Sequence, residues 1–395
     1  MPESSGFPPC DLVVAGAGLF GLTVAERAAR ELGLRVLVLE RRPHIAGNCF
    51  TEADPDTGTE VHRYGSHIFH CTHRGIWDYV NRFTRFNGYR HHVFTVHRGH
   101  LYAMPINLLT ISAFFGRAMR PAEARALIAG QAAELGDRVP GNFEEKAISL
   151  IGRPLYEAFI RGYTQKQWDT DPRLLPADII TRLPVRLTTE ARYFSDRFEG
   201  IPEDGYTAMC ERMADHPGIA VRLRVDFLAV RDRLPRGVPV VYTGPIDRYF
   251  EYRLGRLSWR SVRFERELVA EGDFQGTAVV NYADPEVPFT RIHEYHHYHP
   301  EKPHPEDRTV IFREYSAFTG TDNEPAYPIR TAENTKIFEA YRALAEAEEG
   351  VIFGGRLGTY RYLDMHQAVG GALACFEKKV RPHFTEGRPG IGGLA

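Results

Sequence analysis

The chain has 395 residues, of which 43% are hydrophobic and 25% are charged, and its formal net charge is −2. A chain of this length and composition can bury a large core, and we expect two or three lobes. The balanced charge, without a long basic run, argues against a nucleic-acid binder, and no apolar stretch approaches the roughly 18 residues that span a bilayer. Five scattered cysteines and a start without signal-peptide features predict a reduced, cytoplasmic protein with no membrane partner.

The first predicted elements form a βαβ unit, with strands over 11–15 and 35–40 and a helix over 19–32. Between the first strand and the helix lies GAGLFG, residues 16–21. Its glycines allow a tight turn and bring bare backbone against a pyrophosphate, which the helix N-terminus then faces with unpaired N–H groups. Glu40 ends the second strand at the spacing typical of a carboxylate that binds a ribose hydroxyl. We therefore predict an adenine-dinucleotide site, and the alternative is a glycine-rich turn in another α/β domain.

The middle of the chain, from about 104 to 170, has helical signals and little strand pattern. Pro121 can occupy the first turn of a helix, Asn142 and Glu145 resemble a capping box for a helix over 143–151, and Pro154 precedes a helix over 155–162. A polar, proline-containing stretch over 165–178 is long enough to be a lid. Residues from about 240 to 315 are rich in short β-prone runs, which predicts antiparallel strands.

The last predicted unit is a strand from Val351 that ends in glycines, followed by a helix that Asp364 caps and that runs from Met365 to about Phe376. We expect this βα unit to return to the N-terminal domain. A second helix N-terminus beside the same dinucleotide is typical of FAD proteins. The glycine turn at Gly47, soon after Glu40, also favours FAD.

One motif is misleading. Residues 293–297 (HEYHH) fit the HExxH pattern of zinc enzymes, but that pattern needs a helix to bring its two histidines together. Here it lies between Pro288 and Pro300 in a β-prone run, where positions four apart are about 13 Å apart. Two ligands of one zinc ion, each about 2.1 Å from it, cannot span that distance. We therefore expect no metal.

Further motifs occur in a fixed order along the chain. They are GSHIFH (65–70), FIRGYTQKQW (159–168), RLPVR (182–186), TRIHE (290–294), AYPI (326–329) and LGTYRYLDM (357–365). Together they resemble the UDP-galactopyranose mutase family over roughly residues 10–380. The resemblance implies an α/β fold with an FAD-binding Rossmann-like domain assembled from discontinuous segments, a helical domain and an antiparallel β-sheet domain. The implied boundaries are 1–75, 203–245 and 335–395 for the FAD domain, 104–170 for the helical domain with a mobile substrate loop over 164–180, and 76–103, 181–202 and 246–334 for the sheet domain.

The resemblance also implies an activity. The family interconverts a nucleoside-diphosphate galactopyranose and its galactofuranose isomer, without net redox change, by attack of N5 of reduced FAD on the anomeric carbon, ring opening and reclosure. The expected partners are the nucleotide-sugar substrate, an external reductant and a second copy in a homodimer. Two alternatives share part of the pattern: an FAD-dependent oxidoreductase of the amine-oxidase type, and a non-catalytic protein that binds flavin or nucleotide sugars.

The matched motifs imply residue roles. Arg182 and Arg291 match the arginines that bind the diphosphate, for which a planar guanidinium is well suited, and His67 matches the histidine of the loop against the flavin ring. Phe159 and Tyr163, four residues apart, can share a helix face and stack on a base. The expected substrate-binding residues are Phe159, Tyr163, Thr164, Trp168, Tyr193, Asn281, Tyr327 and Tyr362. The expected cofactor-binding residues are Gly16, Gly18, Phe20, Gly21, Glu40, Arg41, Asn48, Arg356, Tyr362, Asp364 and Met365.

Two segments depart from the family pattern. After Asn107 we would expect an Asn-Gln amide pair near the base and ribose, and this chain has TISA over 110–113 instead. His91 and His92 stand close to the expected sugar pocket, where the family often carries Asn-Arg or a single histidine. Because a lost base-reading amide leaves the base less specified, UDP is the favoured nucleotide, while GDP and dTDP stay open.

Overall fold

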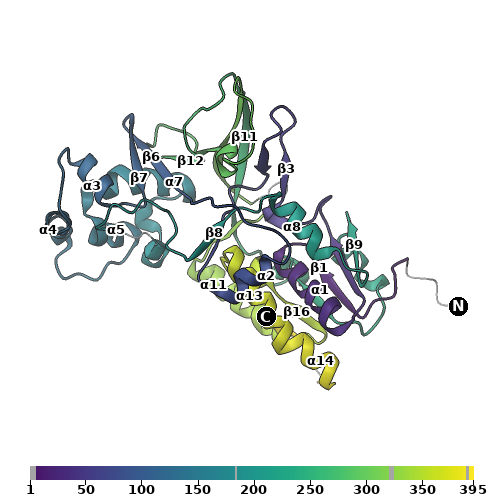
Figure 1. The fold of residues 1–395 in the computed structure, drawn as a ribbon. Coiled ribbons are helices and arrows are strands. Elements are labelled where there is room, and N and C mark those ends of the chain that lie inside the picture. The colour runs from purple at the N-terminus through teal and green to yellow at the C-terminus, as the bar shows by residue number, and fades with distance from the viewer. Residues whose placement is uncertain (1–5, 183–184, 320–323, 388–390) are drawn as a thin grey trace.

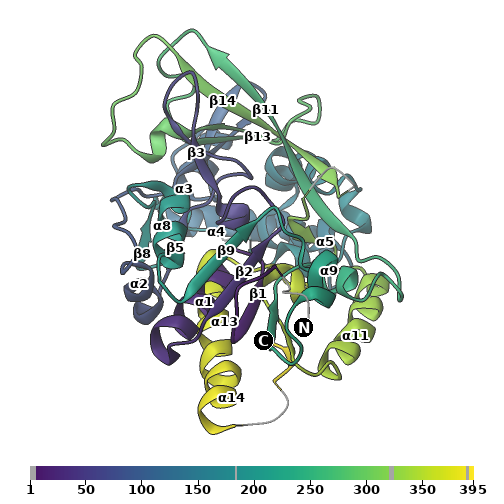
Figure 2. The ribbon, with the colours of Figure 1, turned by 90° about the vertical axis from the view of Figure 1, so that its right-hand side faces the viewer.

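Two large sheets organise the chain in the computed structural model, which describes residues 6–182, 185–319, 324–387 and 391–395. Figure 2 shows β11, β13 and β14 of one sheet above β1, β2 and β9 of the other. Figure 1 shows the helices of the middle region, α3 to α5, set apart from α1, α13 and α14, which lie beside the lower sheet. Within these described residues, no helix combines the length and apolar character needed to cross a membrane.

The lower sheet is parallel and draws its strands from three separate parts of the chain. In spatial order it contains β17 (Gly393–Leu394), β16 (Val351–Phe353), β10 (Val240–Tyr242), β1 (Leu12–Ala15), β2 (Val36–Glu40) and β9 (Ile219–Leu223). Every residue of β1 and β2 is buried, as expected for parallel strands covered on both faces. The chain passes from β1 to β2 on one side of β1 and, after β9, crosses over to β10 on its other side. Such switch points hold ligands at the carboxyl ends of the strands.

Helices cover both faces of the parallel sheet. Leu12 and Val14 of β1 belong to the core cluster that includes residues of α1 (Leu19–Leu32) and α13 (Met365–Cys375). Val13 and Ala15 point to the other face, where they belong to the cluster with residues of α11 (Ala332–Glu346). The remaining helices around this sheet are α2 (Arg74–Val80), α8 (Gly205–Ala214), α9 (Phe227–Val230), α10 (Ile246–Tyr249), α12 (Gly355–Gly358) and α14 (Arg381–Glu386). The predicted helix 19–32 and the predicted return of a C-terminal βα unit to this sheet are confirmed.

The upper sheet contains the hairpin β6–β7 and five later strands. In spatial order it contains β15 (Tyr327–Pro328), β11 (Trp259–Val269), β14 (Thr309–Phe318), β13 (Arg291–Glu294), β12 (Val279–Tyr282), β6 (Val93–His97) and β7 (His100–Met104). Its neighbours pair antiparallel as expected, except that β12 runs parallel to β6. The exception is possible because a long connection, which contains the helical region, separates these two strands, whereas a short turn would force antiparallel pairing. Two small pairs, β3 (Thr51–Ala53) with β4 (Glu60–His62) and β5 (Phe69–Cys71) with β8 (Phe198–Gly200), complete the strands.

The helical region comes after the hairpin. It contains α3 (Leu108–Phe114), α4 (Pro121–Ala132), α5 (Phe143–Ile151), α6 (Arg153–Leu155) and α7 (Gly162–Trp168). Asn142 caps α5 by accepting a hydrogen bond from the Glu145 backbone N–H (3.0 Å), but the predicted capping box is only half formed, because the Glu145 carboxylate accepts from the Gly141 N–H (2.7 Å). The predicted helix 155–162 is wrong in extent: a π-helical turn over Tyr156–Arg161 joins α6 to α7, and helical structure continues to Trp168. The extra residue in this turn rotates the side chains of α7 about the helix axis, and such turns are frequent at functional sites.

Candidate active site

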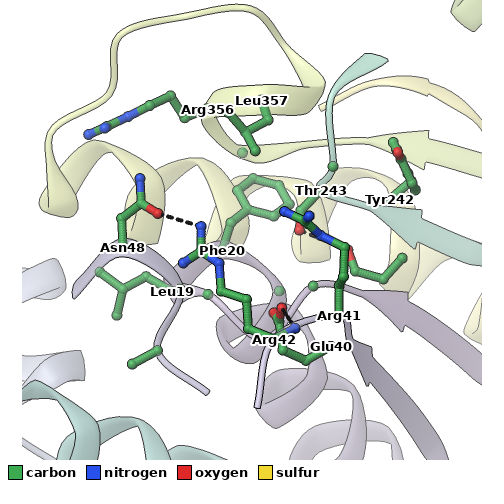
Figure 3. Close-up of a pocket in the computed structure, with 18 of the residues that line it drawn as sticks. Leu19, Phe20, Glu40, Arg41, Arg42, Asn48, Tyr242, Thr243, Arg356 and Leu357 are labelled. Carbon is green, nitrogen blue, oxygen red and sulfur yellow. Dashed lines mark hydrogen bonds between the residues drawn. The ribbon is translucent and has the colours of Figure 1, made fainter. Parts of the chain in front are cut away.

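A cavity of about 220 Å³ lies at the carboxyl ends of β1, β2 and β10, at the switch point of the parallel sheet. Figure 3 shows Arg356 and Leu357 on one side of it and Glu40, Arg42 and Asn48 on the other. Of the cofactor residues predicted from the sequence, those that line it are Gly16, Gly18, Phe20, Gly21, Glu40, Arg41, Asn48, Arg356 and Met365. The other two lie close by: Asp364 is the N-cap of α13, and the Tyr362 ring lies 5.2 Å from the Arg356 guanidinium.

The three glycines of the turn between β1 and α1 are required for different structural reasons. Gly16 has a φ of 111°, which side chains rarely adopt, and a Cβ there would lie 2.0 Å from Thr243 Oγ1. A Cβ at Gly21 would lie 2.0 Å from the Gly16 carbonyl oxygen, so this glycine lets α1 pack on the turn. Gly18 is the N-cap of α1 and has ordinary extended backbone. A Cβ at Gly18 would meet no atom closer than 3.8 Å. The open space at Gly18 is where a phosphate can approach the helix N-terminus.

Glu40 and Arg42 supply the polar groups at the end of β2. The Glu40 carboxylate is fixed by two backbone donors, Ala17 N–H and Arg42 N–H, each at 2.8 Å. The Arg42 guanidinium donates to Asn48 Oδ1 (2.8 Å), while its Nη1 is a buried donor without a hydrogen-bond partner among the described residues. An unused buried donor costs free energy unless a ligand accepts from it. The bare backbone at Gly18, this free donor and the fixed carboxylate fit the diphosphate and ribose of FAD.

His67 also lines the cavity. Its backbone N–H donates to His62 Nδ1 (3.0 Å), and its ring Nδ1 lies 2.6 Å from the Gly65 carbonyl oxygen. The pKa of His67 is lowered to about 4, chiefly because burial disfavours the charged ring. His67 is therefore neutral near pH 7, and its Nδ1–H donates to the Gly65 carbonyl.

Arg291 lies on β13 of the upper sheet and is partly exposed, within a network that also contains the buried side chains of His293 and Glu314. Its Nη2 donates to the Tyr163 hydroxyl on α7 (2.6 Å), and its Nε lies 3.1 Å from Glu314 Oε1 on β14. Glu314 is the residue directly across the sheet from Arg291. Burial alone raises the pKa of the Glu314 carboxyl, but the Arg291 charge and a hydrogen bond from His293 outweigh burial and bring this pKa to about 2. The ionised carboxylate in turn keeps the guanidinium charged and oriented.

The same network reaches the loop beside the cofactor cavity. His293 Nε2 lies 2.9 Å from Glu314 Oε2, and its Nδ1 lies 2.6 Å from Ser66 Oγ, the residue before His67. Tyr298 donates its hydroxyl hydrogen to Ser66 Oγ (2.5 Å). A neutral His293 that donates from Nε2 to Glu314 satisfies every one of these contacts, and burial lowers its pKa. The network thus joins Arg291 to the loop that carries His67.

Sequence reasoning assigns no roles to Ser66, His293 or Glu314. Ser66 lies inside the GSHIFH motif, and the sequence pattern around His293 suggests only a zinc ligand. Glu314 gives no signal, because its partners are distant in the sequence: His293 lies 21 residues away, and Ser66 lies 227 residues from His293. Only the pairing of β13 with β14 brings these groups together.

Lys166 anchors α7 to the turn between β12 and β13. Its ammonium group contacts four backbone carbonyl oxygens, those of Tyr282 (2.6 Å), Asp284 (2.9 Å), Val287 (3.0 Å) and Phe289 (3.1 Å). Burial lowers the pKa of Lys166 to about 8. The helix that carries Tyr163 and the turn that leads to Arg291 are therefore held together by one side chain.

The other predicted substrate residues lie at different depths. Phe159 is 2% exposed and packs edge-on against Tyr102 (4.9 Å between ring centroids) and Phe114 (5.3 Å), while Tyr163 contacts Arg291, so the two rings have different partners here. The role of Phe159 in stacking on a base stays a prediction. Thr164 is buried on α7, and Trp168, the last residue of this helix, is partly buried against the core.

Asn281 lies beside Arg291, and Tyr327 lies near the cofactor cavity. Asn281 is the β12 neighbour of Arg291, and its buried Oδ1 has no hydrogen-bond partner within the described ranges. Tyr327 stacks on Tyr362 with ring centroids 5.7 Å apart. The Arg182 side chain lies outside the described residues.

Tyr193 and His91 form an edge-on pair, with ring centroids 5.6 Å apart. Tyr193 is 43% exposed, whereas His91, which belongs to a segment that departs from the family, is buried. Burial and the nearby Arg291 charge lower the pKa of His91 to about 3. A neutral His91 therefore adds no charge beside Arg291.

Comparisons with known proteins bear on the whole chain. The model of a family described as UDP-galactopyranose mutase matches residues 158–362, and that of an NAD(P)-binding Rossmann-like domain matches residues 14–83. A probable UDP-galactopyranose mutase of Klebsiella pneumoniae is 42% identical over 366 residues, which cover 92% of this chain and 93% of that protein. A dTDP-fucopyranose mutase of Escherichia coli is 35% identical over 377 residues, which cover 94% of this chain and 98% of that protein. The crystal structure of a reduced UDP-galactopyranose mutase shares the fold, with a TM-score of 0.67 at 14% identity and 96% of each chain covered.

Proposed function

Because the chain belongs to the UDP-galactopyranose mutase family, an FAD-dependent family of isomerases, we propose that it interconverts a nucleoside-diphosphate galactopyranose and its galactofuranose isomer. The observation that carries this proposal is the pairing of the partly exposed Arg291 with the buried Glu314 and with Tyr163, linked through His293 to the loop beside the FAD cavity. An oxidase would not need a diphosphate-binding arginine placed in this way.

The cofactor has a defined place in this proposal. Gly18, Glu40, Arg42 and Asn48 would hold the dinucleotide part of FAD, and His67 lies in the same cavity. When reduced, the bound flavin supplies the electron-rich centre that reacts with the anomeric carbon. The His67 ring is neutral, so it adds no positive charge to this cavity. It would therefore not draw electron density away from the reduced flavin.

Arg291 would bind the diphosphate that leaves the anomeric carbon and returns to it. Its planar guanidinium can donate to two phosphate oxygens at once, and Tyr163 can turn its hydroxyl hydrogen to another. Glu314 fixes the guanidinium from behind, so the arginine is oriented before the substrate arrives. A leaving group that stays bound can recombine with the rearranged sugar, which is what an isomerisation without net redox change requires. Arg182 is the expected second arginine at this diphosphate.

The nucleotide assignment rests on residues 110–113 of α3, the segment in which this chain differs from the family pattern. The Thr110 hydroxyl donates to the Ala103 carbonyl oxygen (2.5 Å), and Ser112 Oγ accepts from the Met119 N–H (3.2 Å). Both hydroxyls are thus engaged in local structure, which leaves the base less specified than an amide pair would. The names of the Klebsiella and Escherichia relatives refer to UDP and dTDP, which both carry pyrimidine bases. We therefore place UDP first and dTDP second, with GDP least favoured.

A chromatographic assay tests the substrate. The dithionite-reduced protein is incubated separately with UDP-galactopyranose, dTDP-galactopyranose and GDP-galactopyranose, and each furanose product is quantified. We expect turnover with UDP-galactose, slower turnover with dTDP-galactose and the least with GDP-galactose. Absence of furanose product from all three donors would refute the proposal, and a faster reaction of GDP-galactose would overturn the nucleotide assignment alone.

The compartment, reductant and assembly belong to the same proposal. All five cysteines lie among the described residues, and each is a buried free thiol, which supports a reducing compartment such as the cytoplasm. A reducing compartment would also supply the external reductant that the flavin needs. We infer a homodimer from the family resemblance, and light scattering during gel filtration tests it: a monomer mass at working concentration would refute it.

A further inference from the structure

The stretch 293–297 does not act as one motif. Glu294 ends β13, and residues Tyr295–Tyr298 form a 3-10 turn rather than further strand. Because side chains alternate along a strand, Arg291 and His293 share the active-site face, and Glu294 points to the opposite face. The turn then brings His296 and His297 to the side of Glu294. His293 and His297 contact different groups, Glu314 and Asp273 respectively, and a different set of side chains gathers around His297.

Four side chains converge on that opposite face: Asp273, Glu294, His296 and His297. Their ligand atoms all lie within 4.8 Å of one another. His297 Nε2 is 3.2 Å from Asp273 Oδ1 and 3.5 Å from Glu294 Oε2, and His296 Nδ1 is 3.6 Å from Glu294 Oε1. Neighbouring ligand atoms of a tetrahedral zinc ion with bonds of about 2.1 Å are separated by roughly 3.4 Å. The contacts of His297 with Asp273 and Glu294 are close to this value, His296 reaches the other Glu294 oxygen, and the wider separations, up to 4.8 Å, need a small side-chain shift.

The surroundings hold the two carboxylates in place. Glu294 is fully buried, and its two oxygens accept hydrogen bonds from the Phe274 N–H (2.9 Å) and the Gln275 N–H (3.0 Å). Asp273 Oδ1 accepts from the Gly276 N–H (2.7 Å). Since each carboxylate oxygen has two lone pairs, every one of these oxygens can still bind an ion. The backbone therefore positions the two carboxylates and leaves them able to bind an ion, whereas His296 Nδ1 would exchange its contact with Thr309 Oγ1 (3.3 Å) for the ion.

We propose that Asp273, Glu294, His296 and His297 form a structural Zn²⁺ site, which revises the expectation of no metal. Two imidazoles and two carboxylates suit zinc, and four protein ligands close the coordination sphere, as in structural rather than catalytic sites. The ion would tie the connection between β11 and β12 to the end of β13. Glu294 lies three residues from Arg291, about 10 Å along the strand and on its other face, so this site is separate from the active site. Without an ion, a protonated His297 would bridge the same two carboxylates.

Metal retention tests this site on the FAD-loaded protein. The protein is treated with a chelator, dialysed, incubated with Zn²⁺ alone and gel-filtered, and its zinc content is measured by mass spectrometry. We expect about one zinc per chain in the wild type and at least a tenfold lower content in Asp273→Asn and in His297→Asn. The control His100→Asn changes an exposed histidine on β7 and should retain zinc like the wild type.

Two further readouts distinguish this site from the active site. FAD content and turnover of Asp273→Asn should equal those of the wild type, since Asp273 is exposed and outside the substrate network. Zinc should raise the thermal midpoint of the wild type and leave that of the variant unchanged. The proposal is overturned if the wild type retains no zinc, which would favour the bridging His297. It is equally overturned if the variants retain as much as the wild type, which would place the ion elsewhere, for example at His70, Asp364 and His366.

Discussion

The FAD cavity and the Arg291 network are built in different ways. The cavity is built around a glycine turn and the end of β2, within residues 16–48, and is completed by residues on either side of β10 and by the returning C-terminal unit. The network uses side chains from α7, β13, β14, the 3-10 turn after β13 and the loop at Ser66, with partners up to 232 residues apart. Where bare backbone faces the cofactor, as at Gly18, binding depends on the absence of a side chain. The Arg291 network instead depends on each side chain that it contains. Substitutions should therefore damage the two regions in different ways.

The largest expected effect is on the network. Arg291→Ala should lower turnover by about 100- to 1000-fold, because the diphosphate loses a preorganised cationic donor. Bound FAD should stay at the wild-type ratio, since Arg291 does not line the FAD cavity. Steady-state rates and the flavin absorbance of the purified variant measure both. A rate within a few-fold of the wild type would remove Arg291 from the mechanism, and the conservative variant Arg291→Lys separates loss of charge from loss of the planar fork.

The next effect concerns acid stability. The folded-state pKa of Glu314 is about 2 against an ordinary 4.5, so its stabilising contribution is complete above pH 4.5 and is lost as the pH falls toward 2. The difference in unfolding free energy between the wild type and Glu314→Gln should therefore shrink by up to about 3 kcal/mol between pH 6 and pH 2. Denaturant titrations at several pH values measure it. The control Glu265→Gln, on the exposed side of β11, should show no such change, and a pH-independent difference for Glu314→Gln would contradict the assignment.

A smaller effect distinguishes the backbone site. Gly18 has a φ of −83°, and a Cβ there meets no atom closer than 3.8 Å, so Gly18→Val should fold normally. Its side chain would occupy the space in which the pyrophosphate approaches α1, and we expect FAD content to fall about tenfold. The flavin-to-protein ratio measures this. Gly130→Ala, at an open position on α4, is the matched control. Full FAD occupancy in Gly18→Val would show that the cofactor approaches elsewhere.

The smallest expected effect is at the end of α7. Trp168→Ala should weaken nucleotide binding about three- to tenfold through loss of one aromatic contact, while Trp168→Phe should lose less. Equilibrium titration with UDP measures the dissociation constant. An unchanged constant in Trp168→Ala would mean that this helix end is only a connector.

The two regions also differ in how well the sequence predicts them. The helix from Leu19 to Leu32 and the cap at Asn142 can be predicted from local patterns, because glycine spacing and side-chain capping act over a few residues. The π-helical turn before Gly162 is not predicted, since it depends on packing rather than on a local signal. The partners of Arg291 could not be predicted, because strand pairing decides them.

Turnover at a defined flavin redox state tests the central claim most directly. The same preparation is assayed with UDP-galactopyranose, once with its flavin oxidised by air and once reduced by dithionite without oxygen. We predict many furanose molecules per flavin in the reduced sample, without further consumption of reductant, and essentially none in the oxidised sample. Equal conversion by oxidised protein, or one equivalent of reductant or oxygen consumed per product, would contradict an isomerase that depends on reduced FAD.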